Sequence, residues 1–95
     1  MYLPNLKHLR YLVALHQHQH FHHAAQACFV SQSTLSSAIL KLEQQLNCQL
    51  IERDNKSFLF TSQGNEFVEK ARKLLVDAND LVNSAKQQGQ SDGGV

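Results

Sequence analysis

The residues best suited to chemistry are six histidines, five of which lie in the segment HQHQHFHH, residues 16–23. Imidazole is a common ligand for zinc, copper and nickel, and its charge changes near neutral pH. His16 and His20 are four residues apart, so they would share one face if a helix continued that far. They would supply two ligands, whereas a structural zinc site has four. We therefore expect no metal and no other cofactor.

The two cysteines, Cys28 and Cys48, lack CxxC spacing, and no export signal precedes them. We interpret them as free or buried thiols rather than as a disulfide. No nucleophile–base pair or carboxylate pair occurs at a spacing that local structure would bring together. No apolar run approaches the roughly 20 residues that span a bilayer. The sequence thus predicts a cytoplasmic protein that is neither an enzyme nor a membrane protein.

Helix is predicted through most of the 95-residue chain, because the chain has a single proline, Pro4, and no glycine before Gly64. A first helix is predicted over residues 4–18, since proline suits a first helical position and leucines repeat at helical spacing. A second, short helix over residues 22–28 contains alanines that favour helix and allow close packing.

The third helix is predicted over residues 32–46, with Ser31 as its N-cap and Asn47 as a left-handed C-cap. Its apolar positions repeat at helical spacing and are expected to face the core: Leu35, Ile39, Leu42 and Leu46. The opposite face gathers Ser33, Ser37, Leu40, Lys41 and Gln44. This helix therefore presents one apolar face and one polar face.

Residues 49–60 are rich in β-forming side chains around the turn sequence DNK, which predicts a β-hairpin. Its tip is expected to carry Arg53, Asp54, Asn55 and Lys56. Thr61 should cap a fourth helix over residues 62–88, about 40 Å long at 1.5 Å per residue. The glycine-rich residues 89–95 are expected to be a flexible tail or linker that precedes another domain.

The fourth helix carries a heptad seam, which is predicted to form a homodimer because the rest of the chain is too short to cover it. The seam consists of Phe67, Ala71, Leu74, Ala78, Leu81 and Ala85. The fold class is thus mainly α: a winged helix-turn-helix over residues 1–61, with the motif at about 21–40, followed by a dimerising linker helix.

This architecture predicts binding of double-stranded DNA, since the N-terminus of the third helix can enter the major groove. The net charge is only +1, but residues 1–65 hold five Lys/Arg against three Asp/Glu, which gives +2. Candidate DNA-binding residues are Ser31, Gln32, Ser33, Thr34, Ser36, Ser37, Lys41, Arg53, Lys56, His22 and His23. The plainer alternative is a solvated helix face and a charged hairpin that protects an edge strand. Thr61 fits a cap better than a DNA contact.

Six motifs in this order and spacing resemble the DNA-binding domain of LysR-type transcriptional regulators: LRYLVAL, HFHHAA, VSQSTLS, KLEQQL, LIER and LFTSQG. The resemblance covers residues 5–88 and is nearest to the OxyR-type peroxide-responsive members. It implies a longer repressor or activator that binds a palindromic operator as a homodimer, through helix 32–46 and the wing, with a tetramer allowed at full length. The resemblance also implies an absent effector-binding domain after the flexible tail. The sensing cysteines would lie in that domain, so Cys28 and Cys48 do not inherit their role.

Three departures from the family pattern concern the DNA-facing residues. Ser33 stands where proline is common, and Leu40 stands where many relatives have arginine. Leucine cannot make the bidentate guanine contact of arginine. His22 and His23 replace basic or hydroxyl residues, so we expect them to add phosphate affinity when protonated.

A second class of function stays open from the sequence alone. It is a histidine-based, metal- or proton-responsive dimeric interaction module that binds no DNA. Retention on a duplex that weakens steeply with salt separates the two classes, because phosphate contacts release counterions.

Overall fold

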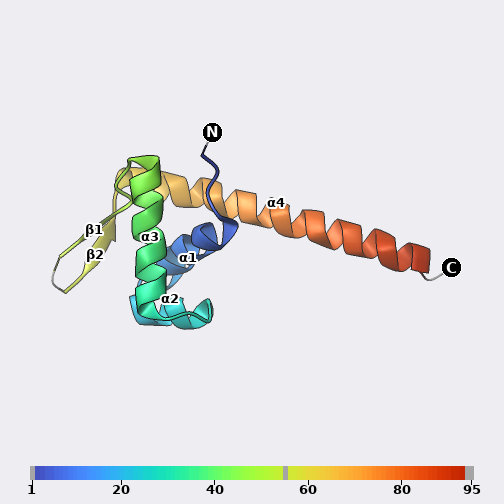
Figure 1. The fold of residues 1–95 in the computed structure, drawn as a ribbon, viewed down its shortest axis with the longest axis horizontal. Helices are drawn as coiled ribbons and strands as arrows, with labels where there is room; N and C mark the ends of the chain where they lie inside the picture. Colours follow the sequence, from blue (N-terminus) through green and yellow to red (C-terminus); the bar gives the residue numbers. More distant parts are fainter. Residues whose placement is uncertain (1, 55, 94–95) are drawn as a thin grey trace.

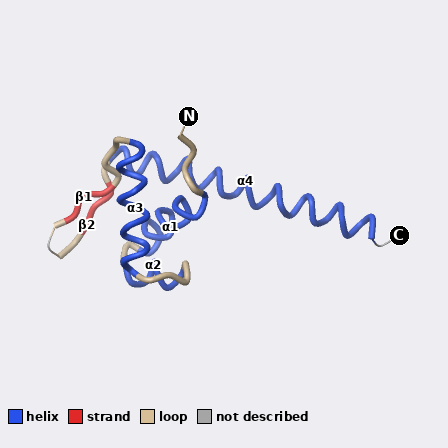
Figure 2. Tube along the Cα trace, viewed as in Figure 1, coloured by secondary structure: helices blue, strands red, loops and turns tan. Residues whose placement is uncertain are grey.

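The computed structural model describes residues 2–54 and 56–93, with side chains up to residue 87. Within this part, the elements follow in the order α1 (Leu6–His18), α2 (Phe21–Ala27), α3 (Gln32–Leu46), β1 (Ile51–Arg53), β2 (Phe58–Phe60) and α4 (Ser62–Gly93). Figure 1 shows α1, α2, α3 and the hairpin gathered at one end, while α4 extends away to the C-terminus. Figure 2 shows that strand is confined to the hairpin. The predicted winged helix-turn-helix with a long C-terminal helix is confirmed.

α1 begins at Leu6 rather than at the predicted Pro4. Asn5 is the N-cap: it is extended, and its side-chain oxygen accepts a hydrogen bond from the Lys7 N–H at 2.8 Å. Such a cap satisfies one of the free N–H groups that begin every helix. The helix ends at His18 because Gln19 turns left-handed, with φ 55°, and its N–H donates to the Leu15 carbonyl.

α2 begins at Phe21, one residue before the predicted start, because His20 acts as its N-cap. The His20 ring accepts a hydrogen bond from the His23 N–H at 3.4 Å. The turn to α3 is tight: Phe29 is left-handed, with φ 59°, and the Val30 N–H donates to the Ala25 carbonyl at 3.0 Å. α2 therefore packs close to α3, as the helix-turn-helix interpretation requires.

α3 has the predicted bounds, Gln32–Leu46. Ser31 caps its start, where the Thr34 N–H donates to the Ser31 hydroxyl at 3.1 Å. Asn47 ends it in a left-handed conformation, with φ 51°. Both ends are set by local signals of known type, which explains why they could be predicted.

The core lies between α1, α2, α3 and the first turns of α4. Its fully buried side chains are apolar and include Leu9, Leu12, Leu15, Leu35, Ile39, Leu42, Leu50 and Val68. The inward face predicted for α3 is confirmed, with Leu46 only partly buried. Each buried side chain of this size contributes roughly 1.5–3 kcal/mol, so this cluster holds the orientation of α3.

The hairpin is antiparallel, with Ile51 paired to Phe60 and Arg53 to Phe58. Its base is tied to α3 by Glu43, whose carboxylate accepts hydrogen bonds from the N–H groups of Leu50, at 2.8 Å, and Ile51, at 3.1 Å. This contact fixes the angle between the hairpin and α3, because two backbone donors would otherwise be left without partners.

α4 begins at Ser62, where the Gly64 N–H donates to the Thr61 hydroxyl at 2.9 Å, which confirms Thr61 as a cap. The helix continues to Gly93, past its predicted end at residue 88, while the flexible tail over residues 89–95 stays a prediction. Gly89 weakens a helix by about 1 kcal/mol, but no proline follows to interrupt the hydrogen bonds. Residues 94 and 95 of that tail lie outside the described residues.

Candidate nucleic-acid interface

The outward face of α3 is polar and accessible. The predicted positions Ser33, Ser37, Leu40, Lys41 and Gln44 are all exposed. Small hydroxyl and amide side chains dominate the N-terminal half of this face, so the helix start can approach another surface closely. Leu40 adds an exposed methyl-bearing side chain farther along.

Hydroxyl groups at the start of α3 are already linked to one another. The Ser31 hydroxyl donates to the Thr34 hydroxyl at 2.9 Å and lies 3.1 Å from that of Ser33. Gln32 Nε2 lies 3.3 Å from His22 Nδ1, so α2 orients this side chain. The Ser31 side chain serves the cap, while Gln32 and Ser33 stay exposed at the helix start.

Arg53 lies against α3 rather than at the hairpin tip, where it was predicted. It is the last residue of β1, and its guanidinium Nη1 donates to the Ser36 hydroxyl at 2.7 Å. The same guanidinium lies 5.2 Å from the centre of the Phe21 ring, which contacts Phe58 edge-on at 5.0 Å. Strand pairing with Phe58 explains this placement, since it directs the Arg53 side chain toward α2 and α3. Ser36 is consequently half-buried, and its hydroxyl already accepts the hydrogen bond from Arg53.

The described part of the hairpin tip is organised by Asp54. Its Oδ1 accepts hydrogen bonds from the N–H groups of Lys56 and Ser57, each at 2.9 Å. These backbone bonds hold the pKa of the Asp54 carboxyl below its usual value. Lys56 is exposed beside this turn. The predicted tip residue Asn55 lies outside the described residues.

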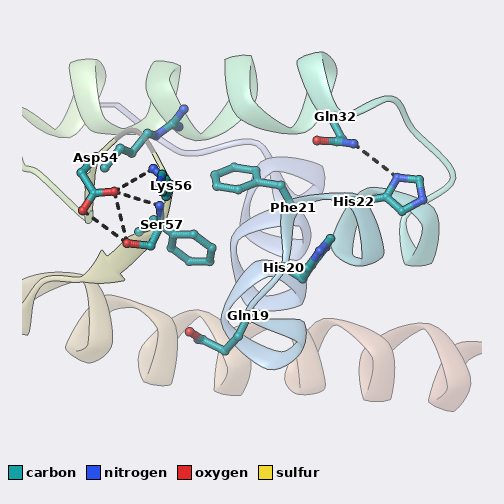
Figure 3. A pocket seen from close by; sticks show the side chains of 10 residues that line it. Gln19, His20, Phe21, His22, Gln32, Asp54, Lys56 and Ser57 are labelled. Carbon is teal, nitrogen blue, oxygen red and sulfur yellow. Dashed lines mark hydrogen bonds between the residues drawn. The ribbon is translucent and has the colours of Figure 1, made fainter.

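A hollow of about 470 Å³ separates the hairpin from the starts of α2 and α3. Figure 3 shows Lys56 and Asp54 on one side of it and His22 and Gln32 on the other. Arg53 also lines this hollow, so cationic and hydrogen-bonding groups of three elements meet there. An anionic ligand such as a phosphate suits this combination.

The histidine run serves three different structural roles. His16 Nε2 donates to Asn65 Oδ1 at 3.0 Å, which ties α1 to α4, and its ring lies edge-on to Phe60. His20 caps α2, and its ring stacks on that of His23 with centroids 4.2 Å apart. Because α1 ends at His18, His16 and His20 share no helix face. In the described ranges, no three His, Cys, Asp or Glu side chains gather as an ion site would require.

The predicted dimer seam divides into two parts. Ala71 is only 4% exposed and Phe67 is partly buried against the core, so both serve this chain's own packing. Their assignment to an intermolecular seam stays a prediction, and within this chain α1 packs on α4. Farther along, Leu74 is 48% and Leu81 72% exposed. Ala78 is half-buried and Ala85 exposed.

Both cysteines are free and partly buried. Burial raises the pKa of the Cys28 thiol, although the positive charge of Arg10 opposes this shift. A thiol with a raised pKa is a poor nucleophile. None of the described helices is both long and apolar enough to cross a membrane.

Sequence reasoning missed a second cationic surface beside α3. Lys7, His8 and Tyr11 of α1 face Ser37 and Lys41 across a hollow of about 390 Å³. The three α1 residues sit at positions i, i+1 and i+4 and could have been recognised as one polar face. Their position beside α3 depends on tertiary packing, which no local pattern shows.

Comparison with known proteins identifies the family. The family model described as "Bacterial regulatory helix-turn-helix protein, lysR family" matches residues 6–65. The hydrogen peroxide-inducible genes activator of Pectobacterium carotovorum subsp. carotovorum is 47% identical over 87 residues, which are 92% of this chain and 29% of that protein. The DNA-binding transcriptional dual regulator OxyR of Escherichia coli K12 is 46% identical over 87 residues, 92% of this chain and 28% of that protein.

Solved structures agree with these relatives. Full-length OxyR from Pseudomonas aeruginosa, in a variant form, superposes with a TM-score of 0.86 at 39% identity, over 90% of this chain and 29% of that one. The BenM DBD in complex with benA site 1 DNA gives a TM-score of 0.83 at 36% identity, over 90% of this chain and 96% of that one. The chain spans about 29% of the curated relatives it matches. It belongs to the lysR family of bacterial regulatory helix-turn-helix proteins.

Proposed function

We propose that this domain binds double-stranded DNA in a sequence-specific manner, with α3 in the major groove and the hairpin on the adjacent backbone. The observation that carries the proposal is the exposed polar start of α3, which Arg53 and Lys56 flank on the hairpin side. Base contacts are assigned to Gln32, Ser33 and Ser37, and phosphate contacts to the two cations. The BenM and CbnR DBD complexes support DNA binding by this domain, because both were solved with DNA.

The remaining predicted residues take supporting places in this proposal. Lys41, Thr34, His22 and His23 are exposed near the same surface and are proposed as backbone contacts. Ser31 and Ser36 act mainly as supports, since the first caps α3 and the second holds Arg53. The histidine-based interaction module is not favoured, because the histidines are divided among a helix contact, a cap and the surface.

The test is a salt titration of duplex binding by the 95-residue chain. Fluorescence anisotropy with a labelled duplex should give an affinity that falls linearly in log–log coordinates with salt. A protein that makes 6–10 phosphate contacts loses roughly 10³–10⁵ in affinity between 50 and 200 mM salt. Binding that is absent, or indifferent to salt, would contradict the proposal.

We further propose that the chain acts as a homodimer through α4 within a longer transcriptional regulator in the cytoplasm, and that it acts by binding rather than by catalysis. The exposed leucines of α4 support the dimer, since an isolated helix has no reason to present them at heptad spacing. The length of the relatives supports the longer regulator, since the matched residues are 29% of the first of them.

Leu74→Asp is expected to split the dimer, because it buries a charge in an apolar seam at a cost of several kcal/mol. Sedimentation should show that the dissociation constant of the dimer rises by at least about tenfold. Val76→Asp is the matched control, since Val76 is 54% exposed and lies on the outer face of the heptad. An intact dimer for Leu74→Asp, or equal effects of both changes, would refute the seam.

Replacing both His22 and His23 with glutamine is expected to weaken duplex binding about two- to fivefold, because both exposed rings are proposed to contact phosphates and a hydrogen bond contributes roughly 0.5–1.5 kcal/mol. His18→Gln is the control, because this exposed histidine lines neither hollow. His20 is left intact, since it caps α2. Unchanged affinity in the double variant, or an equal loss for His18→Gln, would contradict the assignment.

A further inference from the structure

A groove lies on the side of α3 opposite the hairpin. Figure 1 shows the hairpin on one side of α3 and α1 on the other. The groove has a volume of about 390 Å³ and is lined by Lys7, His8 and Tyr11 from α1 and by Ser33, Ser37 and Lys41 from α3. Both lysines are exposed and come from different helices. Two cationic side chains thus border one groove that also offers hydroxyl donors.

Among the described residues, none of those that line this groove is acidic. α1 contains no aspartate or glutamate, and the lone acidic residue of α3, Glu43, accepts hydrogen bonds from the backbone of Leu50 and Ile51. Among the described residues, the one ion pair is Arg72–Glu69 on α4. Lys7 and Lys41 therefore keep their charge available for an external anion.

The first turn of α1 holds the groove in place. The Lys7 N–H donates to Asn5 Oδ1 at 2.8 Å, so the backbone that carries this lysine is capped. Tyr11 is half-buried against the core, and the His8 ring lies 6.1 Å from its ring. α1 also packs directly on α3. The groove is part of the rigid domain rather than of a loop.

We propose that this groove binds a backbone phosphate of the DNA strand opposite the one that the hairpin contacts. This inference rests on the proposed function. The major groove is about 12 Å wide, and a helix with its side chains is about 10–12 Å across, so an inserted α3 fills it. Elements on both sides of α3 then face the two backbones: Arg53 and Lys56 face one strand, and Lys7 and Lys41 face the other. The Tyr11 hydroxyl adds a neutral donor to the same phosphate.

The test compares charge-removing variants of the 95-residue chain on one labelled duplex. Lys7→Gln combined with Lys41→Gln should lower the slope of log affinity against log salt by about 0.9 for each phosphate that the variant no longer neutralises. Lys70→Gln combined with Lys73→Gln is the matched control, because it also removes two charges, from exposed positions on α4. Tyr11→Phe should weaken binding without changing the slope, since it removes a donor but no charge. Helix content and thermal midpoint are checked for each variant.

A second arm assigns the strand. Neutral methylphosphonates are placed one at a time along each strand, and affinity is measured for wild type and for the Lys7/Lys41 double variant. The same scan with Arg53→Gln identifies the strand that the hairpin contacts. On the other strand, one methylphosphonate position should abolish the difference in affinity between wild type and the Lys7/Lys41 double variant. An unchanged salt slope in the double variant, with Arg53→Gln still lowering it, would overturn this inference alone. If the wild-type chain shows no salt-dependent binding to the duplex, both this inference and the proposed function are overturned.

Discussion

Ser37→Glu is expected to weaken binding to a duplex by about a hundredfold or more. Ser37 is exposed on the outward face of α3, less than two turns from its cap. A carboxylate there would face DNA phosphates, and like charges brought together at an interface cost several kcal/mol. Anisotropy at fixed salt measures the loss, and sedimentation should show that the oligomeric state is kept.

Loss of folding cannot explain the result expected for Ser37→Glu. A glutamate at residue 37 lies four residues before Lys41, an arrangement that stabilises a helix by a few tenths of a kcal/mol. Ser84→Glu supplies the control, since the same change is made at an exposed position on α4. Unchanged affinity for Ser37→Glu would mean that another face of the domain meets DNA.

The sequence predicts those parts of the fold that local signals determine. α3 has the expected bounds because Ser31 and Asn47 are ordinary capping residues. The start of α2 was missed by one residue because His20 does the capping, and histidine is not among the preferred caps. α4 continues beyond its expected end because glycine makes a helix less stable without preventing it, so a glycine-rich composition does not determine where a helix ends.

The part of the candidate site that lies on one helix could be predicted from the sequence. The parts formed by residues from several elements could not. Periodicity alone placed Ser33, Ser37 and Lys41 on the outward face of α3. Contacts between distant residues were not visible: Arg53 reaches Ser36 across 17 positions in sequence, and Glu43 reaches the base of the hairpin. The α1 groove depends in the same way on tertiary packing. These long-range contacts turn a polar helix face into a surface with two cationic edges.

Gly64→Ala is expected to destabilise the domain by about 3 kcal/mol, at the upper end of the range for overpacking. A Cβ atom at residue 64 would lie 2.0 Å from the carbonyl oxygen of Leu50 and 2.8 Å from its carbonyl carbon. Both are backbone atoms, so no side chain can move aside. The start of α4 would have to retreat, which would strain the Thr61 N–H bond to the Leu50 carbonyl, now 3.0 Å long.

The Gly64→Ala result should show as a fall in thermal midpoint of about 12–24 °C, given roughly 4–8 °C per kcal/mol for a domain of this size. Gly89→Ala is the control: its backbone is helical, so the same methyl group should stabilise α4 slightly. Because the Leu50 N–H also donates to the Glu43 carboxylate, the strain should reach the base of the hairpin and the position of Arg53. Gly64→Ala should therefore lower stability and DNA affinity together, whereas Ser37→Glu lowers affinity alone. A midpoint within about 2 °C of wild type would show that α4 and Leu50 do not approach so closely.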